Sequence, residues 1–91
     1  MRKAAKRDAN EREIIDALEA YGVSVTRLSQ EGVPDLLCST KKGKWWFLVE
    51  VKSAKGCLTT EQANFIAKHG AWVHIARSKD DVDLIMRVEG A

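Results

Sequence analysis

Hydrophobic positions recur with two different periods along the chain. Between residues 8 and 21 apolar side chains return every three or four positions, which predicts a helix that Gly22 ends. Runs rich in β-branched, aromatic or other apolar residues predict strands at 23–28, 35–39 and 45–52. Residues 41–44, with three lysines and a glycine, predict the turn of a hairpin between the last two of these strands.

The second half of the chain continues this pattern. Thr59 resembles an N-cap, with Gln62 three residues later, for a helix that ends at Gly70. Residues 71–77 are almost continuously apolar, so we expect a strand buried on both faces. A last helix is expected after Ser78. The order α-β-β-β-α-β-α predicts an α/β fold with a mixed sheet flanked by helices.

The strand over 45–52 places two opposite charges at the end of an apolar face. Because side chains alternate along a strand, Glu50 and Lys52 share a face with Trp46 and Leu48. Burying either charge unpaired costs on the order of several kcal/mol. Pairing of the two side chains with each other at the rim of the sheet would compensate both charges, and for an isolated Glu-x-Lys that interpretation is favoured over catalysis.

Asp35 strengthens the functional interpretation. The predicted hairpin brings it beside Glu50, and two adjacent carboxylates repel unless a proton or a cation lies between them. Oxygen ligands of this kind suit Mg²⁺ or Mn²⁺, and the backbone carbonyl of Val51 can add another. The alternative is an ordinary turn aspartate after Pro34.

Two further polar residues have both a functional and a structural interpretation. Glu11 lies on the stripe formed by Ile14, Ile15 and Leu18, as a functional acid facing the sheet or as a capping partner of Asp8. Gln62 is either a site residue or half of a capping box with Thr59. His69 and His74 are not placed to act together.

Basic residues cluster at several points, although the net charge is only +2. A clustered distribution suits a protein that presents one basic face to the phosphates of DNA, and solubility alone is the simpler explanation. The candidate phosphate contacts are Arg2, Lys3, Lys6 and Arg7 in a basic arm over residues 1–7, Lys41, Lys42 and Lys44 in the predicted turn, and Lys55.

Length and composition limit the class of protein. Ninety-one residues fit one domain, 1–91, and so short a chain favours a dimer. The two cysteines, Cys38 and Cys57, lack the spacing of a metal or redox motif, and Cys38 is expected in the core. The sequence offers neither a signal peptide nor an apolar stretch of membrane length, so we expect a cytoplasmic protein without a membrane partner.

The motifs together resemble a known family. Glu11-Arg12-Glu13, Gly32-Val33-Pro34-Asp35-Leu36-Leu37, Val49-Glu50-Val51-Lys52-Ser53 and the segment 59–62 look like the PD-(D/E)XK nucleases. More narrowly they resemble the VRR-NUC group and its relatives, the archaeal-type Holliday junction resolvases. The resemblance spans residues 11 to about 81, and the Gly-x-Pro-Asp and Glu-Val-Lys-Ser segments in this order are its most specific part.

The resemblance implies a restriction-endonuclease-like core that hydrolyses phosphodiester bonds with Mg²⁺ or Mn²⁺. The family's site residues match Glu11, Asp35, Glu50 and Lys52, and its downstream glutamine matches Gln62. Asp35 and Glu50 would hold the metal, and Glu11 would bind it directly or through water. Short members of the group resemble homodimeric enzymes that cut four-way junctions, and so compact a version is typical of a phage or bacterium.

Two other functions fit the same motifs. One is a DNA-binding module of the same fold in which the acids are only structural. The other is a nuclease with a different substrate: flaps, nicked duplex or linear DNA.

Overall fold

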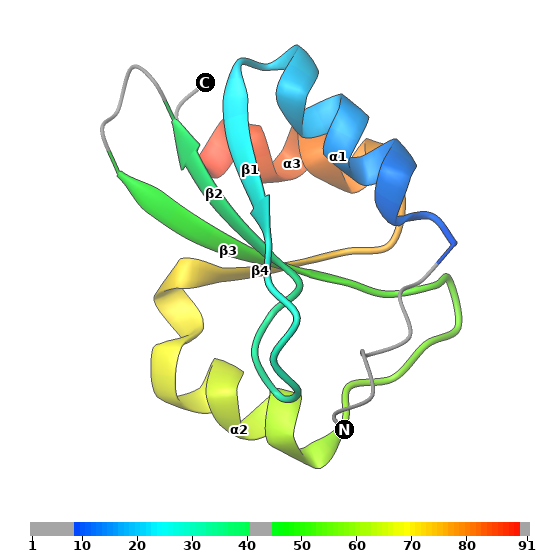
Figure 1. Ribbon diagram of the computed structural model, residues 1–91, viewed down its shortest axis with the longest axis vertical. Coiled ribbons are helices and arrows are strands. Elements are labelled where there is room, and N and C mark those ends of the chain that lie inside the picture. The colour runs from blue at the N-terminus through cyan, green and yellow to red at the C-terminus, as the bar shows by residue number, and fades with distance from the viewer. Residues whose placement is uncertain (1–8, 41–44, 90–91) are drawn as a thin grey trace.

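In the described part of the chain, four strands form one mixed sheet in the order β1-β2-β3-β4 (Figure 1). The computed structural model describes residues 9–40 and 45–89. β1 pairs with β2 and β2 with β3 in antiparallel fashion, whereas β3 and β4 run parallel. The strands are β1 (Val23–Arg27), β2 (Leu36–Thr40), β3 (Trp46–Val51) and β4 (Val73–Ala76).

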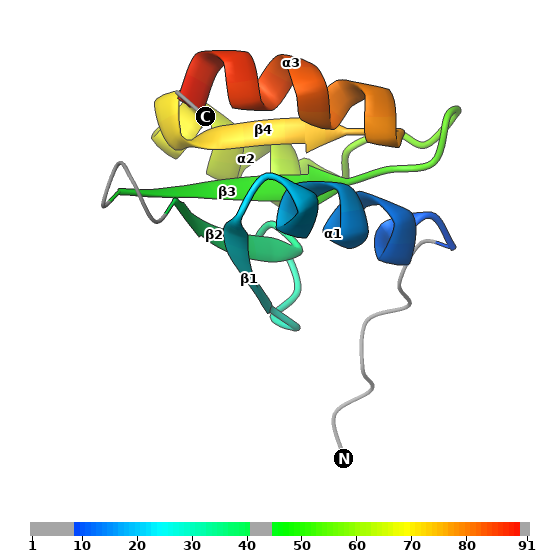
Figure 2. The ribbon, with the colours of Figure 1, turned by 90° about the horizontal axis from the view of Figure 1, so that it is seen from above.

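Helices cover both faces of this sheet. The first and last helices, α1 (Glu11–Ala20) and α3 (Lys79–Glu89), contact each other and lie on one face. The crossover from β3 to β4 carries α2 (Thr60–His69) and a short 3₁₀ turn, η1 (Gly70–Trp72), on the other face (Figures 1 and 2). Within the described ranges, none of the helices has the length and apolar character needed to cross a bilayer.

The core lies between the sheet and the α1–α3 layer. Phe47, Val49 and Val51 are buried on the β3 face that meets these helices, as strand alternation predicts. Their partners from the helices include Ile14 and Val82, both fully buried. Cys38 belongs to the same core, which confirms its predicted position.

The α2 face of the sheet is covered unevenly. All residues of α2 are at least partly exposed. On β3, Trp46 is 55% exposed at one end of the strand, whereas Glu50 is 1% exposed near the other end. The face of the sheet under α2 therefore buries the carboxyl group of Glu50 and leaves the indole of Trp46 in contact with solvent.

The predicted fold class and order of elements are confirmed, with three local differences. The first helix begins at Glu11, after Asn10, and Asp8 lies outside the described residues. The predicted strand over 71–77 is shorter, because Gly70–Trp72 forms a 3₁₀ turn. Its expected burial on both faces is wrong: β4 is an edge strand, and Ala76 is its buried residue.

Candidate active site

Asp35 and Glu50 meet where β2 begins and β3 ends. The antiparallel pairing of Leu36 with Val49 carries the preceding Asp35 to a position opposite Glu50. Oδ2 of Asp35 accepts a hydrogen bond from the backbone N–H of Val51 at 2.8 Å, which fixes the carboxylate against the strand. The expectation that the hairpin brings these two acids together is thus met by the geometry.

Glu50 is a buried carboxyl group in a mixed electrostatic environment. Its Oε2 accepts a hydrogen bond from Nε2 of Gln62 at 3.1 Å and lies 3.6 Å from Nζ of Lys52. Burial, followed by a hydrogen bond to Asp35 and the charge of Asp35, raises the pKa of Glu50 to about 8, against the opposing effect of Lys52. At neutral pH this carboxyl therefore favours its protonated form.

The second oxygen of Glu50 makes no hydrogen bond to the described residues. Among the described residues, Oε1 of Glu50 is buried without a hydrogen-bonding partner. Buried polar atoms in proteins are nearly always satisfied, so an atom of this kind requires an explanation. An oxygen ligand of a cation, next to a second carboxylate, is one that fits.

Gln62 completes the predicted capping box and also contacts Glu50. Thr59 and Gln62 form a complete capping box: Gln62 N–H donates to Thr59 Oγ1 at 3.1 Å, and Thr59 N–H donates to Gln62 Oε1 at 2.9 Å. The other end of the same amide donates to Glu50. The cap at the start of α2 therefore orients the donor that faces the carboxylate.

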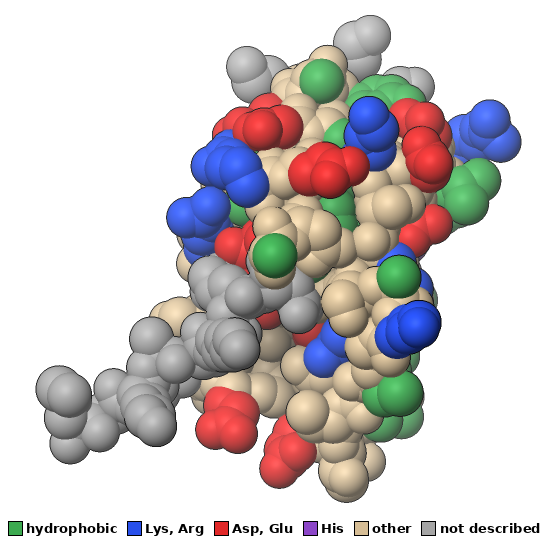
Figure 3. Space-filling model, turned by 90° about the vertical axis from the view of Figure 1, so that its right-hand side faces the viewer, with side chains coloured by type: hydrophobic (Ala, Val, Ile, Leu, Met, Phe, Trp, Pro, Cys, Tyr) green, Lys and Arg blue, Asp and Glu red, His purple; other side chains and the backbone are tan. Residues whose placement is uncertain are grey.

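These residues line a small polar cavity. Its volume is about 160 Å³, and its walls come from the β1–β2 connection, the ends of β2 and β3, and the start of α2. Asp35, Glu50, Lys52, Thr59 and Gln62 all line it. Figure 3 views the molecule from this side, where acidic and basic side chains are set back in a hollow near the middle of the face. A cavity of this size and polarity can admit water and a phosphate oxygen.

Glu11 lies apart from this cluster. It is buried on α1, and its Oε2 pairs with Nε of Arg27 at 3.2 Å. It is not one of the described residues that line the cavity. Throughout ranges 9–40 and 45–89, no group of three or more His, Cys, Asp or Glu side chains is arranged to hold a metal ion. The geometry gathers two carboxylates, a lysine and a glutamine, and leaves the third acid on a neighbouring element.

Comparison with known proteins supports the same fold. No family model and no curated protein matches the chain. A solved structure described as a "VRR_NUC domain" is 27% identical to it, with a TM-score of 0.67 over 85% of this chain and 89% of that one. The chain has the VRR-NUC fold.

The donor set of this VRR-NUC fold is compatible with a divalent metal. Asp35 and Glu50 supply carboxylate oxygens, the ligands that Mg²⁺ and Mn²⁺ prefer, and Oε1 of Glu50 is available for coordination. A cation between the two groups would also remove the repulsion that raises the pKa of Glu50. The residues present therefore fit such an ion.

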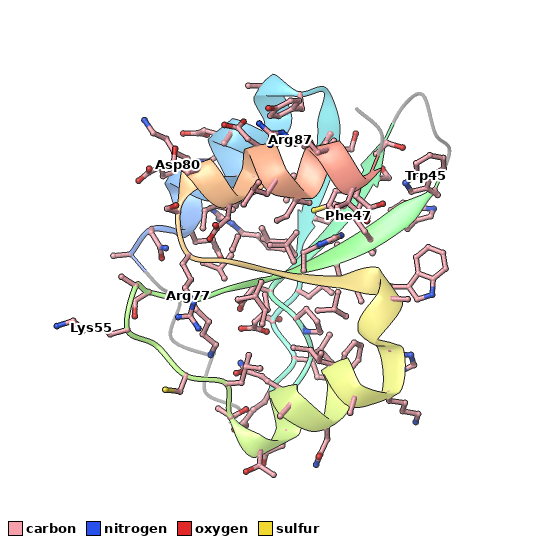
Figure 4. The ribbon with its side chains drawn as sticks, turned by 180° about the vertical axis from the view of Figure 1, so that it is seen from behind. Trp45, Phe47, Lys55, Arg77, Asp80 and Arg87 are labelled. Carbon is pink, nitrogen blue, oxygen red and sulfur yellow. The ribbon has the colours of Figure 1, made fainter. Side chains whose placement is uncertain are left out.

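Lys55 is the one predicted phosphate contact within the described residues. Arg2, Lys3, Lys6 and Arg7 of the basic arm, and Lys41, Lys42 and Lys44 of the turn, lie outside the described residues. Lys55 is exposed on the loop that follows β3, and its side chain points away from the molecule (Figure 4). It remains accessible to a polyanion.

The sequence analysis missed two residues that support this site. Asn10 donates from Nδ2 to the carbonyl oxygen of Lys52 at 3.0 Å and to that of Arg77 at 2.8 Å, which links the start of α1 to the ends of β3 and β4. Arg77 in turn donates from Nη1 to the carbonyl oxygens of Ser53 and Gly56, at 2.8 and 2.6 Å (Figure 4). Asn10 directly precedes a helix, a position that predicts a helix cap. The local sequence around Asn10 and Arg77 does not predict contacts with residues so distant along the chain.

Proposed function

We propose that this VRR-NUC fold is a metal-dependent DNA endonuclease that hydrolyses phosphodiester bonds, with branched DNA such as a four-way junction as its substrate. The observation that carries the proposal is the Asp35–Glu50 pair, in which Glu50 is buried, beside Lys52 in a polar cavity. Paired carboxylates with an adjacent cation are the groups that phosphodiester hydrolysis with a bound metal requires.

Each residue has a distinct role in this mechanism. Asp35, Glu50 and the backbone carbonyl of Val51 would hold Mg²⁺ or Mn²⁺, and Glu11, which pairs with Arg27 outside the cavity, would support the ion through water. Such an ion would supply Lewis acidity and would lower the pKa of a water beside it. Lys52 orients the attacking water and offsets negative charge that develops on the phosphate oxygens. Gln62, through its hydrogen bond, keeps the Glu50 carboxylate in one orientation.

The basic residues would bind the DNA backbone. Contacts from lysine and arginine to phosphates position a duplex without reading its sequence. The residues proposed for this are the arm Arg2, Lys3, Lys6 and Arg7, the turn lysines Lys41, Lys42 and Lys44, and Lys55.

A homodimer fits the proposed substrate. Resolution of a four-way junction requires two cuts on strands related by a twofold axis, and one copy of the chain carries one such site. Light scattering with and without a junction tests this: a particle with the mass of two copies is expected, and a monomer under both conditions excludes it. A cytoplasmic setting is part of the proposal and agrees with two free cysteines.

The deciding experiment compares a labelled four-way junction with a linear duplex of the same arms, in the presence of Mg²⁺ or a chelator. Cleavage of the junction that requires Mg²⁺ is expected, and its loss in Asp35→Asn and Glu50→Gln. Glu13→Gln is the matched control, because Glu13 is exposed on α1. Equal cleavage by all three variants contradicts the assigned site, and preference for a flap or linear DNA would change the substrate alone.

A magnesium titration separates an enzyme from a binding module. Calorimetry on the wild-type chain is expected to give a saturable heat that Glu50→Gln abolishes. Tight binding of DNA with no magnesium heat and no cleavage would instead indicate a DNA-binding module whose acids are structural.

A further inference from the structure

All three tryptophans of the chain line one apolar cavity, away from the acidic site. This cavity measures about 430 Å³ and is formed by Leu37, Trp45, Trp46, Phe47, Leu48 and Trp72. Trp45, Trp46 and Trp72 are 40%, 55% and 56% exposed. Large apolar side chains gathered on a surface in this way mark a binding site more often than isolated exposed ones do.

One wall of the cavity is held in place by hydrogen bonds to Glu89. The indole Nε1 of Trp45 donates to Oε1 of Glu89 at 3.0 Å, and Oε2 of Glu89 lies 2.6 Å from Nε2 of His74. Glu89, the last residue of α3, is only 8% exposed. Figure 4 shows Trp45 beyond the end of this helix. The indole is therefore exposed to a ligand but restrained, which lowers the entropic cost of binding to it.

The tryptophan cavity and the proposed active site both include residues of β3. Trp46 and Glu50 share a face of β3 and are four residues apart, a separation of about 13 Å along a strand. Trp72 lies near Trp46 in the same cavity, because the residue after Trp72, Val73, pairs with Leu48 of β3. A DNA strand stacks one nucleotide about every 3.4 Å, so the tryptophans lie within reach of nucleotides about four positions from a phosphate at Glu50.

Charge in the sequence favours a polyanion over a second copy of the chain. Lys41, Lys42 and Lys44 directly precede Trp45 in the covalent chain. A symmetric contact between two such surfaces would bring both lysine segments together, and like charges oppose this. A ligand with negative phosphates and flat apolar rings instead matches both features, because bases stack on aromatic side chains whatever their sequence.

We infer that the surface formed by Trp45, Trp46 and Trp72 binds unpaired nucleobases of a DNA strand whose phosphate lies in the Asp35–Glu50 site. The inference rests on the proposed function and narrows its branched substrates to those with unpaired nucleotides next to the cut, such as a flap. Trp46 and Trp72 supply the stacking faces, and Glu89 positions Trp45 through the indole N–H.

Intrinsic fluorescence tests this directly, since all tryptophan emission of the chain arises from the cavity. The full chain is titrated, in a chelator that prevents cleavage, with an oligothymidylate and with an abasic oligonucleotide of the same length. The two probes carry the same phosphates and differ in their bases. We expect the oligothymidylate to quench the emission and to bind at least about tenfold more tightly. Equal affinity and equal emission for the two probes would overturn the inference.

Matched variants test which tryptophans cause the preference for the base-containing probe. Trp46→Ala and Trp72→Ala are expected to remove most of the preference for the base-containing probe, whereas Trp72→Phe retains part of it. Leu84→Ala is the control, because Leu84 is an equally exposed apolar residue of α3 at 57%. Thermal unfolding checks that each variant folds. Unchanged preference in both alanine variants would refute the stacking surface.

Two further outcomes keep the proposals separate. If emission changes with protein concentration in the absence of DNA, and Trp46→Ala converts a dimer to a monomer, the surface is a dimer interface and the inference fails. If abasic and base-containing probes bind alike while Glu50→Gln loses cleavage, the inference fails and the nuclease proposal stands. If base-dependent quenching occurs without any cleavage, the nuclease proposal fails instead.

Discussion

The side-chain amide of Gln62 donates to Oε2 of Glu50 at 3.1 Å while its oxygen accepts the backbone N–H of Thr59 at 2.9 Å. One residue thus links the start of α2 to the buried carboxyl of β3. The consequence is that stability of the helix end and orientation of the carboxyl are coupled, and substitutions at Thr59 and Gln62 can separate them.

Removing only the cap should leave the site intact. Thr59→Ala is expected to lower the free energy of unfolding by about 1 kcal/mol, because it removes one capping hydrogen bond, and to keep Mg²⁺-dependent cleavage. Gln62→Ala should cost similar stability and also reduce kcat about tenfold or more, because a donor to a charged group is lost. Urea unfolding and cleavage rates measure the two effects.

Gln62→Glu is the matched test of the hydrogen bond itself. Glutamate also completes a capping box, so the helix end should remain capped. A third carboxylate beside Glu50 and Asp35 replaces the donor and should impair cleavage. Full activity in this variant would show that the Gln62–Glu50 contact has no part in orienting the site.

The raised pKa of Glu50 predicts how stability depends on pH. Burial and Asp35 raise the pKa of Glu50 in the folded chain from 4.5 to about 8, so the folded state binds a proton more tightly than the unfolded state. This contribution to stability is therefore fully present below about pH 4.5 and is lost as the pH rises through about 8. Urea unfolding across this range should show the decline.

The control for this pH dependence is Glu50→Gln, which cannot ionise. Its stability should vary less with pH over the same interval, although other groups still contribute. Mg²⁺ should also stabilise the wild-type chain at high pH, because a ligand that binds only the folded state shifts the equilibrium towards it. A wild-type stability that rises from pH 5 to about 8 while the Glu50→Gln stability stays level would contradict the assignment.

Asn10 is expected to hold the strand end that carries Lys52. Asn10→Ala leaves the carbonyl oxygens of Lys52 and Arg77 without their donor and should cost about 1–3 kcal/mol. Asn64→Ala is the control, since Asn64 is exposed on α2. Asn10→Asp should be worse than alanine, because it places a carboxylate against two carbonyl oxygens. Chemical denaturation of the three variants measures this order, and equal stability of all three would refute it.

Lys55 tests the electrostatic contribution to DNA binding. If it contacts a phosphate, Lys55→Ala should weaken binding by a similar factor for all sequences and reduce the slope of log affinity against log salt by about one. Lys79→Ala is the control, because Lys79 is exposed at the start of α3. Binding titrations at several salt concentrations with a catalytically inactive variant provide the measurement. Identical slopes for wild type and Lys55→Ala would remove Lys55 from the interface.

Local patterns in the sequence determined the helices, the strands and part of the candidate site. Alternation along residues 45–52 placed Glu50 and Lys52 on one face, and the predicted hairpin placed Asp35 opposite Glu50, as the strand register confirms. The capping box of Thr59 and Gln62 was predictable as well, because both partners lie within one helical turn. These relationships depend on neighbours in sequence or on one hairpin, so the pattern of residue types is sufficient to specify them.

Only the tertiary structure decided the contacts between distant segments. The pairing of Glu11 with Arg27, the contacts of Asn10 with Lys52 and Arg77, and the bond from Trp45 to Glu89 join elements that no periodicity brings together. The same holds for the limited burial of β4, which follows from its place at the edge of the sheet. Hydrophobic packing is not directional, so the sequence specifies which faces are buried, and the packed arrangement of α1, α3 and the sheet then selects which polar groups meet.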